Sequence, residues 1–157
     1  MKKIWKLIIS ILIPFLASAI GGFFTSTSVS TWYVSLVKPS FNPPSWIFGP
    51  VWTLLYLLMG IALYLVWIKK SDKKAFIAFG VQMFLNALWS VLFFGLQKPL
   101  LAFIEIIFLW AAILFTTFYF YRINKISAYL LIPYILWVSF AAVLNFYLFI
   151  LNFWCCN

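Results

Sequence analysis

Five long apolar runs divide the chain, and they constrain its fold more than any other feature of the sequence. A helix needs about 20 such residues to cross the hydrocarbon core of a bilayer. The runs lie at about residues 5–26, 46–68, 75–96, 100–121 and 127–152. Only 8% of the residues are charged, whereas about 25% are charged in an ordinary soluble domain. The sequence therefore predicts an integral membrane protein.

The same pattern predicts an all-α bundle of five transmembrane helices, formed by a single domain over residues 1–157. The short alternating segments of a membrane β-barrel are absent, so the backbone has to satisfy its hydrogen bonds within helices. One long polar connection, at about 27–45, joins the first two runs. The first run also fits a secretory signal with Ala17-Ser18-Ala19 as its cleavage site. Because apolar residues continue through Phe24, an uncleaved first helix is the favoured interpretation.

Cationic residues are distributed unevenly between the two sides that this topology creates. Nine lie at the N-terminus or in the second and fourth connections, whereas Lys38 and Lys98 lie on the opposite side. Positive charge favours the cytoplasmic side. We therefore expect a cytoplasmic N-terminus, with the long loop and the C-terminus on the other side. The net charge of +9 then reflects topology and contact with anionic lipid, and it does not indicate nucleic-acid binding.

Hydrolytic and metal chemistry are excluded by the residue types that the sequence lacks. It has no histidine, and its two carboxylate side chains are Asp72, in a charged connection, and Glu105, inside the fourth run. No catalytic triad, acid–base pair or metal-ligand set can be assembled from these residues. Cys155 and Cys156 are adjacent and match no disulfide or metal framework, so they receive no role. Glu105 is open to a functional or a structural interpretation, because ionisable groups in membrane helices are often functional.

Polar and aromatic residues inside three of the runs recur at helical spacing, which places each set on one helix face. The sets are Trp52, Tyr56 and Gly60 in the second run, Gln82, Asn86, Trp89 and Phe93 in the third, and Pro133, Trp137, Ala141, Leu144 and Asn145 in the fifth. Packing alone is the simplest explanation for any single tryptophan among them. Because amides are costly in lipid, however, these faces are expected to point into the bundle. An apolar pocket with a few placed polar groups is typical of a small-molecule site.

The long loop leads into the proline-rich stretch KPSFNPPSWIFGP at residues 38–50. Its prolines fix backbone angles in the loop, so the loop is expected to be stiff and to act as a lid. Gly49 and Pro50 suit an N-cap followed by the first helical residue. The free N–H groups of that helix start, together with Lys38, form a hypothetical contact for an acidic ligand group. An ordinary loop-to-helix cap is the alternative.

The motif residues extend over most of the chain. They are Gly21-Gly22, Trp32-Tyr33, Lys38-Pro39, Pro43-Pro44, Trp46, Gly49-Pro50-Val51-Trp52-Thr53, Met59-Gly60, Gln82, Asn86, Trp89-Ser90, Pro133-Tyr134, Trp137 and Leu144-Asn145. This set resembles the signature of the TspO/translocator protein (TspO/MBR) family, formerly the peripheral benzodiazepine receptors. The resemblance implies a five-helix bundle, often a homodimer, whose pocket is closed by the loop between the first two helices.

The resemblance also implies ligands. Family members bind porphyrins such as protoporphyrin IX, synthetic isoquinoline carboxamides and benzodiazepines, and in many cases sterols. Some bacterial members are reported to promote light-dependent porphyrin breakdown. The proposed sterol motif of eukaryotic members is incomplete here, because no Lys or Arg follows Tyr147. The short basic N-terminus and compact length are typical of a bacterial member.

The expected function is therefore a membrane receptor or sensor that binds porphyrin-like tetrapyrroles and other hydrophobic ligands, with transport as an extension and no required cofactor. The alternative is a light- and oxygen-dependent porphyrin-degrading enzyme in which Trp52 and Trp137 are catalytic. Periodicity and resemblance together give the expected ligand-binding residues Tyr33, Trp52, Tyr56, Gln82, Asn86, Trp89, Trp137, Ala141, Leu144 and Asn145.

Overall fold

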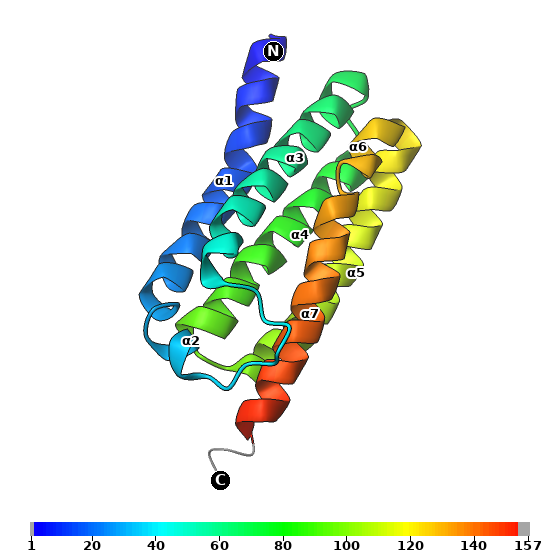
Figure 1. Ribbon diagram of the computed structural model, residues 1–157. Coiled ribbons are helices and arrows are strands. Elements are labelled where there is room, and N and C mark those ends of the chain that lie inside the picture. The colour runs from blue at the N-terminus through cyan, green and yellow to red at the C-terminus, as the bar shows by residue number, and fades with distance from the viewer. Residues whose placement is uncertain (1, 154–157) are drawn as a thin grey trace.

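The computed structural model describes residues 2–153, and the interpretation of Cys155 and Cys156 concerns residues outside this range. Figure 1 shows a bundle of long helices with the two ends of the chain at opposite ends of the bundle. The long helices are α1 (Lys3–Ser28), α3 (Phe48–Lys69), α4 (Lys73–Ser90), α5 (Pro99–Ile123) and α7 (Ile132–Phe153). The shorter elements are α2 (Trp32–Ser35), the 3₁₀ turn η1 (Ser45–Ile47), the π-helical segment η2 (Val91–Gly95) and α6 (Lys125–Tyr129).

The predicted five-helix membrane bundle is confirmed. Within residues 2–153, five helical segments are long and apolar enough to cross a membrane. They are Lys3–Ser28, Ser45–Lys69, Lys73–Gly95, Pro99–Ile123 and Lys125–Phe153. Local capping explains two of the helix starts, because a side-chain oxygen there accepts backbone N–H groups that a helix leaves free. Asp72 Oδ1 accepts from the Lys74 N–H at 2.9 Å, and Asn124 Oδ1 accepts from the Ile126 N–H at 3.0 Å.

One predicted helix start needs correction. The α-helical part of the second span begins at Phe48 after the 3₁₀ turn η1, so Gly49 and Pro50 lie inside its first turn. The N-cap is Ile47, and it makes no side-chain cap hydrogen bond. The turn extends the helix backwards and removes the need for a capping side chain.

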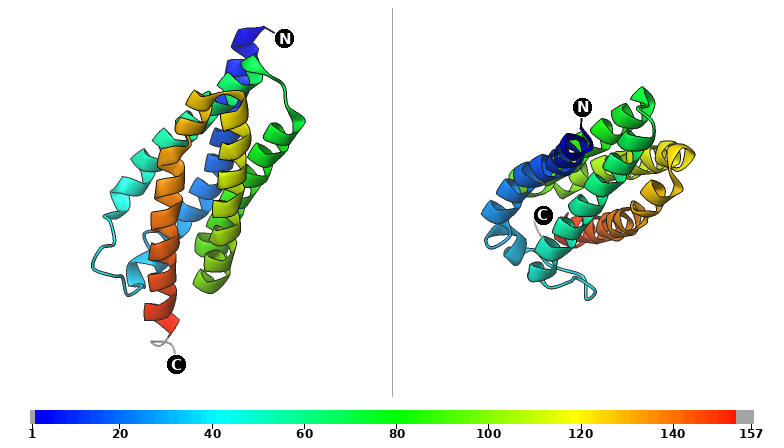
Figure 2. Two further views of the ribbon diagram at one scale, coloured as in Figure 1. Left: turned by 90° about the vertical axis from the view of Figure 1, so that its right-hand side faces the viewer. Right: turned by 90° about the horizontal axis from the view of Figure 1, so that it is seen from above.

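Helix α1 packs against α3 and α4, while α5 packs against α4 and α7, and Figure 2 shows this arrangement from the side and end-on. Two glycines set the approach of α1. A Cβ atom at Gly60 would lie 2.9 Å from Ile11 Cα, and one at Gly21 would lie 2.9 Å from Ser90 Oγ. In lipid there is little hydrophobic driving force between helices, so close contact through small residues is a main source of helix association.

The buried residues form two clusters at different levels of the bundle. The larger one fills the middle and the N-terminal end of the bundle and includes Met59, Leu63 and Ile113. The smaller one lies at the other end, beneath the long loop, and includes Tyr33, Phe93 and Leu148. The loop therefore contributes one of its own side chains, Tyr33, to the interior.

The long loop crosses the end of the bundle from α1 towards α7 before it enters η1 (Figure 1). Asn152 of α7 accepts from the Val37 N–H and donates to the Val37 carbonyl, both at 2.9 Å. The ring of Phe41 lies 5.3 Å from that of Tyr147, also on α7. These contacts attach the loop to α7, so it covers the end of the bundle as a lid.

Candidate ligand-binding site

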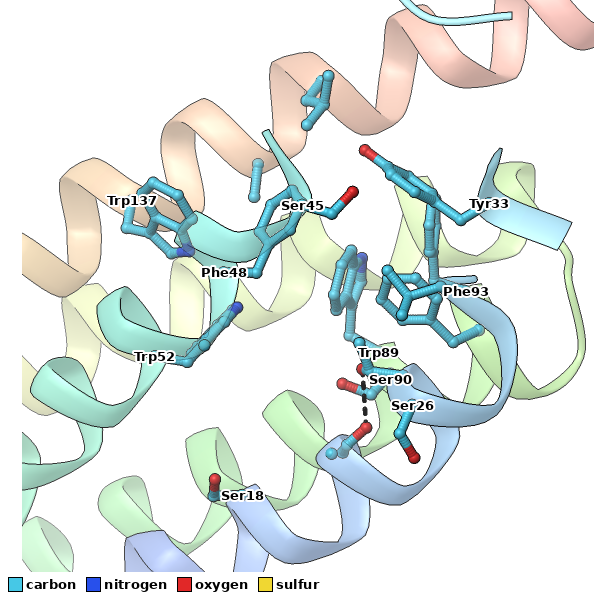
Figure 3. A pocket seen from close by; sticks show the side chains of 18 of the residues that line it. Ser18, Ser26, Tyr33, Ser45, Phe48, Trp52, Trp89, Ser90, Phe93 and Trp137 are labelled. Carbon is cyan, nitrogen blue, oxygen red and sulfur yellow. Dashed lines mark hydrogen bonds between the residues drawn. The ribbon is translucent and has the colours of Figure 1, made fainter. Parts of the chain in front are cut away.

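A cavity of about 370 Å³ lies beneath the lid, between α1, α3, α4 and α7 (Figure 3). This volume falls within the ~300–1,000 Å³ of small-molecule sites. Among the described residues, those that line it are Ser18, Gly21, Gly22, Thr25, Ser26, Val29, Tyr33, Ser45, Phe48, Gly49, Trp52, Thr53, Tyr56, Trp89, Ser90, Phe93, Phe94, Trp137, Ala141, Leu144, Asn145 and Leu148. The lining is mostly apolar and aromatic, with scattered hydroxyl groups.

Aromatic rings form two sides of the cavity. In Figure 3, Trp52 and Trp137 lie on one side, and Tyr33, Trp89 and Phe93 lie on the other. The ring of Trp89 stacks on that of Phe93 with centroids 5.2 Å apart. Large planar surfaces therefore face the space from α3, α7, α4 and η2.

Hydrogen bonds hold the orientation of two of these rings. The Trp89 indole Nε1 donates to Asn145 Oδ1 at 3.1 Å, and Asn145 Nδ2 donates to the Pro99 carbonyl at 2.8 Å. The Tyr33 hydroxyl donates to Asn42 Oδ1 at 2.7 Å. Burial raises the pKa of Tyr33 from 10.0 to about 12, so this lid residue is neutral at physiological pH.

The cavity opens sideways between α1 and the start of α3. The exposed residues of the lining are Gly22 and Ser26 on α1, with Ser45, Gly49 and Thr53 on η1 and α3. All five are small, so no bulky side chain closes this side. Because α1 and α3 are both membrane-spanning segments, the opening faces the surface that a bilayer covers.

Eight of the ten predicted ligand-binding residues line the cavity, namely Tyr33, Trp52, Tyr56, Trp89, Trp137, Ala141, Leu144 and Asn145. Asn86 is buried behind Tyr56 and joins two tyrosines. Its Oδ1 accepts from the Tyr56 hydroxyl at 2.6 Å, and its Nδ2 donates to the Tyr134 hydroxyl at 2.9 Å. Gln82 lies one turn before Asn86 on α4. It is fully buried and is not part of the lining.

Lys38 also lies outside the lining. Its Nζ donates to the carbonyls of Val34 and Leu36, both at 3.0 Å, and lies 5.0 Å from the centre of the Tyr33 ring. The N–H of Ile47 donates to the Pro44 carbonyl within η1. Lys38 and the Ile47 N–H were expected to be free for an acidic ligand group. Each thus has a hydrogen-bond partner within the loop or the turn η1.

The α1 side of the cavity was missed by sequence reasoning. Ser18, Gly22 and Thr25 recur at helical spacing and line the space together with Gly21 and Ser26. A face of small residues on an otherwise bulky apolar helix is the signal that could have identified this side, because such residues leave room beside a helix.

A model of one known protein family matches most of the chain. The TspO/MBR family model matches residues 10–151. This chain belongs to the TspO/MBR family. The match includes every lining residue of the cavity, and the family resemblance of the motif residues is confirmed.

Individual relatives cover most of the TspO/MBR chain. It is 48% identical to the tryptophan-rich protein TspO of Archaeoglobus fulgidus, over 96% of this chain and 99% of the relative. It is 36% identical to the human translocator protein, over 86% and 83% of the two chains. A tryptophan-rich sensory protein of Cereibacter sphaeroides is 33% identical over 73% of each chain. The protein is therefore an integral membrane protein of a receptor and sensor family.

Proposed function

We propose that this TspO/MBR protein is a membrane receptor or sensor that binds a porphyrin-like tetrapyrrole in the cavity beneath the lid. The observation that carries the proposal is the pair of aromatic sides, with Trp52 and Trp137 opposite Trp89 and Phe93. Such a site should stabilise a bound flat, apolar, conjugated macrocycle most, because this ligand buries both of its faces and stacks on the aromatic rings.

The lateral opening supports the same ligand class. A cavity of about 370 Å³ is small for a substituted tetrapyrrole, so part of the macrocycle would extend between α1 and α3. Porphyrins partition into membranes, and a ligand in the bilayer reaches the cavity through this side without crossing water. The hydroxyl groups of Ser26, Ser45 and Thr53 lie where polar substituents would emerge. Entry by this route also allows movement of the ligand within or across the bilayer.

The orientation and assembly are part of the proposal. The cation distribution supports a cytoplasmic N-terminus, with the lid on the opposite side of the membrane. Homodimer formation rests on the family resemblance alone. Lys38 lies at the lid, and it would have to release two carbonyl groups of the loop to meet an acidic ligand group.

A titration of the purified protein with protoporphyrin IX in the dark tests the proposal. We expect saturable quenching of tryptophan fluorescence, with an affinity about thirtyfold lower in Trp137→Ala, because the loss of a buried aromatic anchor costs about 2 kcal/mol or more. Trp110→Ala is the matched control, because Trp110 lies on α5 outside the lining. Quenching that does not saturate, or equal weakening in both variants, would contradict binding in this cavity.

A second function is favoured by one observation: Trp52 and Trp137 line the same side of the cavity. An excited porphyrin bound there would lie against two oxidisable indoles, and molecular oxygen would be the oxidant that breaks the macrocycle. Illumination with oxygen should then bleach the porphyrin bands faster than in empty detergent. Trp52→Phe and Trp137→Phe should bind but not bleach. A stable spectrum under light would leave only the receptor function.

A further inference from the structure

Glu105 is a buried acid inside the helix bundle. Its side chain is 7% exposed and lies on α5, a helix that contributes none of the lining residues among those described. Ala102, one turn earlier, packs in the cluster beneath the lid, whereas Ile106 and Leu109 pack in the main cluster. Glu105 thus lies in the bundle interior at the boundary between the two clusters.

The carboxyl group has no partner there. Neither of its oxygens makes a hydrogen bond with any of the described residues. The ion pair found within residues 2–153 joins Lys70 to Asp72, and Lys98, the cation nearest in sequence, is exposed to the surroundings. An ionised carboxylate without partners is strongly disfavoured in such an interior.

A chain of hydrogen bonds runs from the cavity towards this acid. Tyr56 lines the cavity and donates to Asn86, which in turn donates to the Tyr134 hydroxyl. Tyr134 is buried on α7 and lies within electrostatic range of Glu105. As an acceptor from Asn86, the Tyr134 hydroxyl keeps its own hydrogen, and none of the hydrogen bonds found over residues 2–153 uses it. The Tyr134 hydroxyl therefore has a hydrogen available for donation to a group in its surroundings.

We propose that Glu105 is a proton-binding site, and that its occupancy is coupled to the cavity through Tyr134, Asn86 and Tyr56. The proton site stands on the burial and isolation of Glu105, whereas the coupling rests also on the proposed function. A ligand atom that accepts from the Tyr56 hydroxyl takes that donor away from Asn86. Reorientation of the Asn86 amide then makes its oxygen an acceptor for Tyr134, so Asn86 takes the hydrogen that Tyr134 could otherwise offer to an ionised Glu105.

The direction of the coupling follows from this exchange. A carboxylate that loses a hydrogen-bond donor holds its proton more readily, so ligand and proton assist each other, and the coupling is reciprocal. The proton exchanges with bulk water, and no other reactant is needed. Tyr134 on α7 interacts electrostatically with Glu105 and with Tyr56 on α3, and α4 contributes the uncharged Asn86, which bonds to both phenols. The lysines at the starts of α4 and α6 lie at the far end of α5.

Infrared spectroscopy tests the proton site directly, because the chain has only two carboxylate side chains. At neutral pH we expect a carbonyl band of a protonated carboxylic acid that is lost in Glu105→Gln. The matched control, Asp72→Asn, should keep the band because Asp72 lies in the connection between α3 and α4. A wild-type spectrum without this band, or a band that survives in Glu105→Gln, would overturn the proton site.

A pH titration of the same band tests the coupling. The probe is the dimethyl ester of protoporphyrin IX, which has no carboxylic acid of its own. The pH at which the band disappears should rise when the ester is bound, and Tyr56→Phe should remove this shift. An unchanged midpoint in the wild-type protein would overturn the coupling. Quenching of tryptophan fluorescence by protoporphyrin IX but not by its ester would overturn the coupling alone. If neither porphyrin quenches the fluorescence, the proposed function and the coupling both fail, whereas the band by itself still decides the proton site.

Discussion

The contact between α1 and α3 at Gly60 gives a quantitative prediction about the bundle. In Gly60→Ala the new methyl carbon would lie 2.9 Å from Ile11 Cα, 3.0 Å from the Ser10 carbonyl oxygen and 3.2 Å from Ile11 Cγ1. Carbon atoms prefer separations of about 3.5–4.0 Å, so α1 has to retreat by about 0.5–1 Å. Two of the three nearest atoms belong to backbone, and rotamer changes cannot relieve those contacts.

The cost of this overpacking is about 1–3 kcal/mol. Part of this cost is offset, because the helix propensity of alanine is more favourable than that of glycine by about 0.8–1 kcal/mol. Gly80→Ala on α4 provides the control, since a Cβ atom at Gly80 meets no atom within 4 Å. The helix preference is common to both variants, so their difference in stability isolates the cost of moving α1.

The assay is thermal unfolding of the purified protein in one detergent, followed by circular dichroism. We expect Gly60→Ala to melt several degrees below wild type, at about 2–4 °C per kcal/mol for a chain of this size, and Gly80→Ala to melt at or slightly above wild type. Porphyrin affinity should fall in the first variant as well, because α1 forms one side of the cavity. Equal melting temperatures for the two variants would refute the close approach of α1 and α3.

Three further predictions concern access to the cavity and its lid. Gly22→Trp should slow both association and dissociation of protoporphyrin IX in stopped-flow experiments, because Gly22 is an exposed lining residue at the lateral opening, whereas Gly80→Trp should not. Asn152→Ala should make the lid loop more sensitive to proteolysis, because it removes two hydrogen bonds to Val37. Together these bonds contribute about 1–2 kcal/mol. The raised pKa of Tyr33, about 12 against 10.0, favours the folded lid below pH 10, and this contribution is lost as pH rises through about 12. Tyr33→Phe should flatten that alkaline decline in thermal stability.

Much of the fold follows from the sequence because lipid leaves the backbone few choices. An apolar run of about 20 residues has to be helical, so the five spans were predictable to within a few residues. The π-helical segment Val91–Gly95 was not predictable from the sequence. In the folded chain this segment contacts α1 and α5 as well as α4, and such long-range contacts cannot be read from the local sequence.

The candidate site was predictable only in part, for a reason that Asn86 illustrates. Periodicity places Asn86 and Trp89 on nearly the same face of α4, and both are inside the bundle. Trp89 reaches the cavity, whereas Asn86 bonds to Tyr56 and Tyr134 at the level where the helices close together. Helix periodicity identifies an interior face, but the distance between neighbouring helices decides whether a residue on that face meets a cavity or another side chain.

The adjacent glycines Gly21 and Gly22 of α1 serve two different purposes, namely close packing of helices and access to the cavity. Gly21 faces inward, and a Cβ atom there would lie 2.9 Å from Ser90 Oγ, so its lack of a side chain holds α1 close to α4. Gly22 is rotated by about 100° on the helix and meets no atom within 4 Å, so its lack of a side chain keeps the lateral opening clear. A methyl group at Gly21 should therefore give a lower stability than one at Gly22, where the helix preference of alanine should leave stability at or slightly above that of the wild type. Closure of the opening needs a larger side chain at Gly22, and that change acts on ligand exchange without disturbing the contact between α1 and α4.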